Sequence, residues 1–128
     1  MKLLLDTHAL LWFLLNDPKL SAVALGLITD PANQKLISPA SYWEIAIKIR
    51  LGKYSLPLAF EPFMTSQIAR NNFTIVPITV AHAAVLTTLP RHHKDPFDRL
   101  LIAQAMVEGV PLVSVDSAFD AYGVTRLW

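Results

Sequence analysis

Four carboxylates occupy positions where a parallel α/β protein gathers its ligand-binding groups: Asp6, Glu44, Asp98 and Asp116. Asp6 and Asp116 each directly follow a short apolar segment, and Glu44 and Asp98 each lie near the start of a predicted helix. The carboxyl ends of parallel strands meet at one edge of a sheet, where ligands bind. We therefore expect all four side chains to converge there.

Converging carboxylates repel one another unless a cation lies between them, so the set predicts a divalent-metal site. Mg²⁺ prefers oxygen ligands and is commonly held by one or two carboxylates together with substrate phosphates. We expect Asp6 and Asp98 to hold the ion directly, and Glu44 and Asp116 to orient water or to hold a second ion. An ion held in this way lowers the pKa of a bound water and stabilises charge on a phosphate. The carboxylates thus predict metal-assisted chemistry on a phosphate substrate.

Two of these acids have a structural alternative. Asp6 can cap the helix that follows it, and Glu44 stands where a capping box starting at Ser41 would place an acid. However, Ser38-Pro39 is the better start for that helix, because proline is favoured at the first helical position. Glu44 then falls in the second turn, beyond the reach of such a box, which favours a functional role.

Asp98 and Asp116 also have structural alternatives, and Asp98 has a second acid, Asp95, three residues before it. Asp95 precedes a proline and is a good helix N-cap, so we expect it to be structural, with a share in the metal role as the alternative. Asp98 itself suits the helix dipole in a first turn, and Asp116 suits the start of a turn. Neither structural role explains why the four acids coincide at strand ends.

A basic loop precedes the helix that contains Asp98, and it consists of Arg91, His92, His93 and Lys94. Beside an acidic pocket, such side chains are suited to contact the phosphates of a nucleic acid. His92 and His93 are also potential metal ligands. Because adjacent side chains on an extended loop point in opposite directions, we expect a substrate-binding role instead.

Strands and helices alternate along the chain. Predicted strands cover residues 2–6, 35–38, 73–78, 110–115 and 124–128. Predicted helices cover residues 7–15, 21–30, 39–51, 59–70, 79–89 and 97–108. Helical connections between strands require right-handed crossovers and a parallel sheet covered on both faces. The pattern predicts a single α/β domain over residues 1–128.

Composition limits the class of partner. Apolar residues make up 53% of the 128 residues, which is more than a small monomer easily hides, so we expect a self-association face or a groove for an apolar partner. The aromatic candidates for such a surface are Tyr42, Trp43, Tyr54, Phe60 and Phe63. The net charge of +1 provides no broad basic field, so nucleic acid would be bound by local clusters of Lys and Arg.

The N-terminal segment and the absence of cysteine bear on the compartment. Met1–Leu5 resembles the start of a signal peptide, but Asp6 and His8 interrupt it and no small-residue cleavage site follows. The apolar run 9–15 is far shorter than the ~20 residues of a membrane span. A chain without cysteine fits a reducing compartment. We expect a cytoplasmic protein with no membrane association.

Four sequence blocks resemble PIN-domain proteins and, more narrowly, the VapC-type ribonuclease toxins of prokaryotic toxin–antitoxin pairs. The blocks are LLLDTHALLW, SPASYWEIAIKIRLGK, RHHKDPFDRLLIAQA and VSVDSAFDAYGV. They occur in the family's order and span nearly the whole chain. The resemblance implies a three-layer α/β/α sandwich with a parallel sheet of about five strands. It also implies a Mg²⁺- or Mn²⁺-dependent endoribonuclease that forms a homodimer and is inhibited by the tail of a cognate antitoxin.

The same resemblance assigns individual residues. The family's acidic residues fall on Asp6, Glu44, Asp98 and Asp116, the set already selected on physical grounds. Its small hydroxyl residues near the site map to Thr7 and Ser114, which we expect to lie beside the substrate.

Three other functions fit part of the pattern. A haloacid-dehalogenase-like phosphatase needs a second Asp two residues after its nucleophile, but His8 stands at that position. A receiver-like, metal-dependent phosphoacceptor module carries paired acids at the end of its first strand, whereas Asp6 stands alone. A catalytically silent PIN scaffold is the third alternative, and the intact set of four acids argues against it.

Overall fold

Five parallel strands form the centre of the computed structural model, which describes all residues from Met1 to Trp128. The strands are β1 (Lys2–Leu5), β2 (Gln34–Ile37), β3 (Thr74–Ile75), β4 (Leu112–Val113) and β5 (Arg126–Leu127). Their order across the sheet is β3-β2-β1-β4-β5, and every neighbouring pair is parallel. β1 is therefore the central strand, and the residue that follows it lies in the middle of the carboxyl edge.

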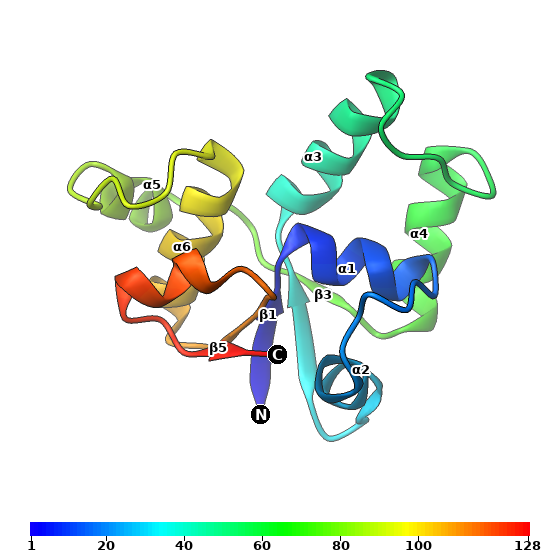
Figure 1. Ribbon diagram of the computed structural model, residues 1–128, viewed down its shortest axis with the longest axis horizontal. Helices are drawn as coiled ribbons and strands as arrows, with labels where there is room; N and C mark the ends of the chain where they lie inside the picture. Colours follow the sequence, from blue (N-terminus) through cyan, green and yellow to red (C-terminus); the bar gives the residue numbers. More distant parts are fainter.

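Helices cover both faces of this sheet. They are α1 (Thr7–Leu14), α2 (Ala22–Thr29), α3 (Pro39–Arg50), α4 (Phe60–Arg70), α5 (Val80–Leu86), α6 (Pro96–Glu108) and the short 3₁₀ helix η1 (Ser117–Tyr122). In Figure 1, α5 and α6 lie on one side of β1, and α1 and α4 lie on the other. The three-layer α/β/α sandwich expected from the sequence is confirmed. No helix has both the length and the apolar character needed to cross a membrane.

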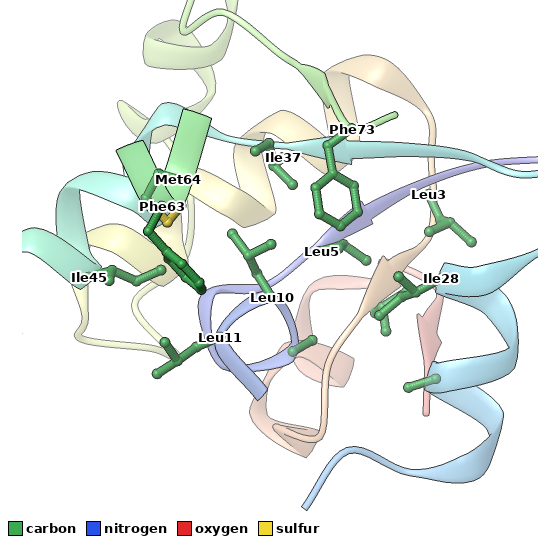
Figure 2. Close-up of a cluster of buried hydrophobic side chains, with 13 residues drawn as sticks. Leu3, Leu5, Leu10, Leu11, Ile28, Ile37, Ile45, Phe63, Met64 and Phe73 are labelled. Carbon is green, nitrogen blue, oxygen red and sulfur yellow. The ribbon is translucent and has the colours of Figure 1, made fainter. Parts of the chain in front are cut away.

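Alternate residues of β1 belong to two separate cores. Leu3 and Leu5 are fully buried in the core beneath α1, α2 and α4, whose side chains Figure 2 shows gathered around them. Leu4 points to the opposite core, where it packs with Leu101 of α6 and Phe119 of η1. Burying a leucine side chain contributes about 1.5–3 kcal/mol, so a strand covered on both faces is held firmly.

Capping residues determine where the helices that carry Glu44 and Asp98 begin and end. The hydroxyl of Ser38 accepts a hydrogen bond from the Ala40 amide at 3.1 Å, and Pro39 opens α3 as predicted. The carboxylate of Asp95 caps α6, with Pro96 in its first position. α6 ends at Gly109, whose φ of 65° is left-handed and turns the chain back towards β4.

Strands β3, β4 and β5 are shorter than predicted. Of the predicted segment 73–78, only Thr74–Ile75 is a strand, and Pro77 has no amide hydrogen with which to extend the ladder. Of the segment 110–115, only Leu112–Val113 is a strand, and it begins directly after Pro111. α5 ends at Leu86 rather than 89, where the Thr87 hydroxyl donates to the Ala84 carbonyl and competes with helical pairing.

Candidate metal centre and the adjacent basic loop

Asp6 follows the central strand and begins α1. Its side chain is 3% exposed, and its Oδ1 accepts a hydrogen bond from the Ala9 amide at 2.7 Å. Its Oδ2 accepts a hydrogen bond from the Ser114 hydroxyl. Burial raises the pKa of Asp6 in spite of both hydrogen bonds. The carboxylate thus caps a helix, as the structural alternative required, and is also fixed where its negative charge is costly.

Glu44 lies in the second turn of α3, as predicted, and is buried. Its Oε2 pairs with the Lys48 ammonium at 2.9 Å, but its Oε1 is buried without any hydrogen-bond partner. A buried carboxylate oxygen without a partner is destabilising by roughly 1–3 kcal/mol or more. Ser41 is not engaged in a capping box with Glu44, since its hydroxyl accepts a hydrogen bond from Thr7 at 3.1 Å.

Asp98 lies in the first turn of α6, close to the other acids. Burial, the negative charge of Asp95, and then the charges of Glu44 and Asp6 raise the pKa of Asp98 to about 7. Its Oδ2 lies 3.1 Å from the Nε2 of His93. The influence of three carboxylates on one pKa indicates a single acidic cluster, which a cation would stabilise.

Asp116 follows β4 and caps η1. Its Oδ1 accepts a hydrogen bond from the Ala118 amide at 2.9 Å, and its Oδ2 lies 3.0 Å from the Nε2 of His93. Partial burial acts to raise its pKa, but the hydrogen bonds from Ala118 and His93 and the charge of Arg126 outweigh burial and lower it. Asp116 therefore stays charged more readily than Asp98.

Asp95 takes the structural role that we expected. Its Oδ1 accepts hydrogen bonds from the amides of Phe97 at 2.8 Å and of Asp98 at 3.2 Å, which is N-cap geometry. Thr7 and Ser114 lie beside the acids, but both side chains are buried and hydrogen-bonded within the protein. Their expected contact with substrate stays a prediction.

The two adjacent histidines diverge, as expected of an extended loop. The ring of His92 packs edge-on against Tyr122 with 5.3 Å between ring centroids. The ring of His93 stacks on Phe119 at 5.6 Å and places its Nε2 between Asp98 and Asp116. Sequence reasoning gave His93 only a substrate contact and missed this place among the acids, because Phe119 comes from a distant segment of the chain.

The donor set fits a hard divalent cation. Ligand atoms of His93, Asp98 and Asp116 lie within 4.8 Å of one another. Asp6 is outside that group but influences the pKa of Asp98, as does Glu44. Carboxylate oxygens are the ligands preferred by Mg²⁺ and Mn²⁺, and the unpartnered Oε1 of Glu44 is an oxygen that such an ion would satisfy.

A basic cavity of about 530 Å³ adjoins the acidic cluster. Its lining residues are Leu86, Arg91, His93, Lys94, Pro96 and Arg99. None of the three permanent cations among them forms an ion pair with a carboxylate. His93 borders both regions, so negative and positive surfaces meet at its ring.

Several solved structures share this architecture. VapBC2 from Rickettsia felis, in a structure bound to a DNA fragment from their promoter, superposes with a TM-score of 0.71 at 17% identity, covering 100% of this chain and 99% of that one. The structure of FitAB bound to an IR36 DNA fragment superposes with a TM-score of 0.70 at 17% identity, covering 98% of this chain and 93% of that one. VapBC-1 from nontypeable Haemophilus influenzae superposes with a TM-score of 0.64 at 15% identity, covering 99% of this chain and 97% of that one.

These TM-scores, at 15–17% identity, show a common fold and no more. Comparison with curated proteins found no match. The model of the PIN domain family matches residues 3–124, nearly the whole sequence, and the chain belongs to the PIN domain family.

Proposed function

We propose that this PIN-domain protein is a Mg²⁺- or Mn²⁺-dependent endoribonuclease that acts as the toxin of a toxin–antitoxin pair. The observation that carries the nuclease proposal is the state of two neighbouring acids. Glu44 has a buried oxygen without a partner, and the pKa of Asp98 is raised to about 7. A divalent cation would relieve both costs at once.

We assign the four acids two different roles at the metal centre. Asp6 and Asp98 would hold the ion, while Glu44 and Asp116 would orient water or hold a second ion. When bound, the ion supplies a water of lowered pKa and stabilises charge on the scissile phosphate. Asp6 is held in place for this role by the Ala9 amide and the Ser114 hydroxyl, so no reorientation of its side chain is needed.

The basic cavity supports a nucleic-acid substrate. Arg91 and Lys94 are exposed, and neither is neutralised by an internal carboxylate. A strand whose scissile phosphate lies at the acids can place a neighbouring phosphate in this cavity, beyond the ring of His93. His92, packed on Tyr122, would contact the strand from the outer side of the loop. RNA rather than DNA follows from the resemblance to VapC-type toxins.

The toxin role and a protein partner follow from the resemblance and gain support from the shared fold of the VapBC and FitAB structures. Of the aromatic residues expected at a partner groove, Trp43 is 57% exposed, whereas Phe63 is part of the core. Trp43 packs edge-on against Phe97 with 5.1 Å between ring centroids, at the junction of α3 and α6. An antitoxin segment covering this apolar rim would lie beside Glu44 and Asp98.

The proposal is tested first by cleavage. Purified protein should cut RNA in the presence of Mg²⁺ or Mn²⁺ and stop when EDTA is added, and Asp6→Asn should be inactive. Full activity in excess EDTA would contradict the metal mechanism. No cleavage of any RNA under either metal would favour the catalytically silent PIN scaffold.

A second experiment separates the toxin role from the nuclease role. Expression of the protein alone should arrest growth of its host, expression of Asp6→Asn should not, and co-expression of the neighbouring antitoxin gene should restore growth. An active nuclease that is harmless at high expression and copurifies with no partner would contradict the toxin role alone. A homodimer remains part of the proposal and is checked by light scattering.

A further inference from the structure

Hydrogen bonds determine which ring nitrogen of His93 carries the proton. The backbone amide of Asp95 donates to Nδ1 of His93 at 3.2 Å. An amide N–H is always a donor, so Nδ1 must be an unprotonated acceptor, and a neutral imidazole then carries its proton on Nε2. That Nε2–H donates to Oδ2 of Asp116, with 3.0 Å between the two heavy atoms. The same Nε2 lies 3.1 Å from Oδ2 of Asp98, which is within ion-pair distance.

Contacts on several sides hold the ring in this orientation. The backbone amide of His93 donates to the Tyr122 hydroxyl at 2.6 Å, and its carbonyl accepts from the Arg99 guanidinium at 3.3 Å. The same guanidinium donates to the carbonyls of Leu89 at 3.0 Å and Pro90 at 2.9 Å. The His93 side chain, stacked on Phe119, is only 14% exposed. The orientation is therefore built into the loop.

This orientation argues against direct metal ligation by His93. A metal bound at Nε2 needs the lone pair of that nitrogen, and the proton of the neutral ring would then move to Nδ1. Nδ1–H would face the Asp95 amide N–H, two donors with no acceptor between them. Oδ1 of Asp98, in contrast, accepts no hydrogen bond and is left for a cation.

We propose that His93 is a positioning residue of the metal centre, whose Nε2–H holds Oδ2 of Asp116, lies against Oδ2 of Asp98 and leaves Oδ1 of Asp98 to the ion. The role rests on the proposed metal-dependent nuclease. Residues that hydrogen-bond to metal ligands typically contribute about 10–100-fold to metal affinity.

Calorimetric titration of the metal-free protein with Mn²⁺ tests this role without an activity assay. His93→Ala should weaken binding by about tenfold or more, and His93→Gln, whose amide can still donate, should weaken it less. His92→Ala is the matched control, because His92 contacts Tyr122 and not the acids. Thermal melting of each variant reports whether it is folded.

The tautomer gives a second, independent readout. In ¹⁵N spectra of the imidazoles, His93 should show a protonated Nε2 and an unprotonated Nδ1, both before and after saturation with Mg²⁺. An unprotonated Nε2 in the Mg²⁺-loaded protein, or unchanged Mn²⁺ affinity in folded His93→Ala, would overturn the positioning role. Failure of the unsubstituted protein to bind Mn²⁺ would instead overturn the metal centre itself, and the role of His93 with it.

Discussion

Ser114 and Asp6 lie 108 positions apart in the chain, yet a buried hydrogen bond joins their side chains. The Ser114 hydroxyl donates to Oδ2 of Asp6, and its oxygen accepts from the amide of Asp116 at 3.0 Å. One small hydroxyl therefore links the acid that follows β1 to the acid that follows β4. The link depends on these two strands being neighbours in the sheet.

Ser114→Ala should destabilise the metal-free protein by roughly 1–3 kcal/mol, because it leaves a buried oxygen of Asp6 without a partner. Urea unfolding in EDTA measures this change. Ser117→Ala is the matched control, since Ser117 is exposed and its hydroxyl makes no hydrogen bond. Equal stability of the two variants would show that the hydrogen bond contributes nothing to the fold.

Variants of Asp95 and Asp98 distinguish a helix-capping acid from a metal-binding acid. Asp98→Asn should abolish most RNA cleavage, because it removes a charged ligand while keeping the shape of the side chain. Asp95→Asn should retain most cleavage and most stability, since Asn caps a helix about as well as Asp. Cleavage rates and thermal melting of the two variants, measured side by side, check this. Loss of activity in Asp95→Asn alone would mean that Asp95, and not Asp98, holds the metal.

The raised pKa of Asp98 predicts that the metal-free protein loses stability as the pH rises. The folded protein keeps the proton up to about pH 7, whereas the unfolded chain loses it near 3.8, so the folded state binds more protons between these values. Unfolding then becomes easier through this window and stays so above pH 7. The pKa of Asp6 is raised as well and acts in the same direction.

Urea unfolding in EDTA at about pH 6 and pH 8 measures this loss, and Asp98→Asn should reduce it. Mg²⁺ should restore stability mainly at the higher pH, where the carboxylates are charged, by about 2.7 kcal/mol at a hundredfold excess over its dissociation constant. The same pH dependence in Asp98→Asn as in the unsubstituted protein would assign the effect to other groups.

Features set by neighbouring residues could be predicted from the sequence. Ser38-Pro39 and Asp95-Pro96 are local helix starts, and the structure places α3 and α6 directly after them. The gathering of acids follows from a similarly simple rule, because residues after parallel strands reach one edge of the sheet. The positions of Asp6 after β1 and of Asp116 after β4 could therefore be predicted without any knowledge of their contacts.

Features set by distant contacts could not be predicted in this way. His93 turns towards the acids because Phe119 and Tyr122 hold its ring and backbone, and nothing in the loop sequence identifies those partners. The aromatic segment shows the same limit, since Trp43 is exposed while Phe63 is buried in the core. Composition predicts an apolar surface but does not say which side chains form it.

The last prediction concerns the basic cavity. Arg91→Ala combined with Lys94→Ala should weaken RNA binding and lower its salt dependence, since each lost phosphate contact reduces the slope of log affinity against log salt by about 0.7 for a single strand. Binding is measured in EDTA, so that the RNA is not cut. Lys19→Ala combined with Lys53→Ala removes the same charge at positions outside the cavity lining and should change the slope far less. If both double variants reduce affinity and slope equally, the positive charge acts through the whole surface, and the cavity beside His93 holds no phosphate of its own.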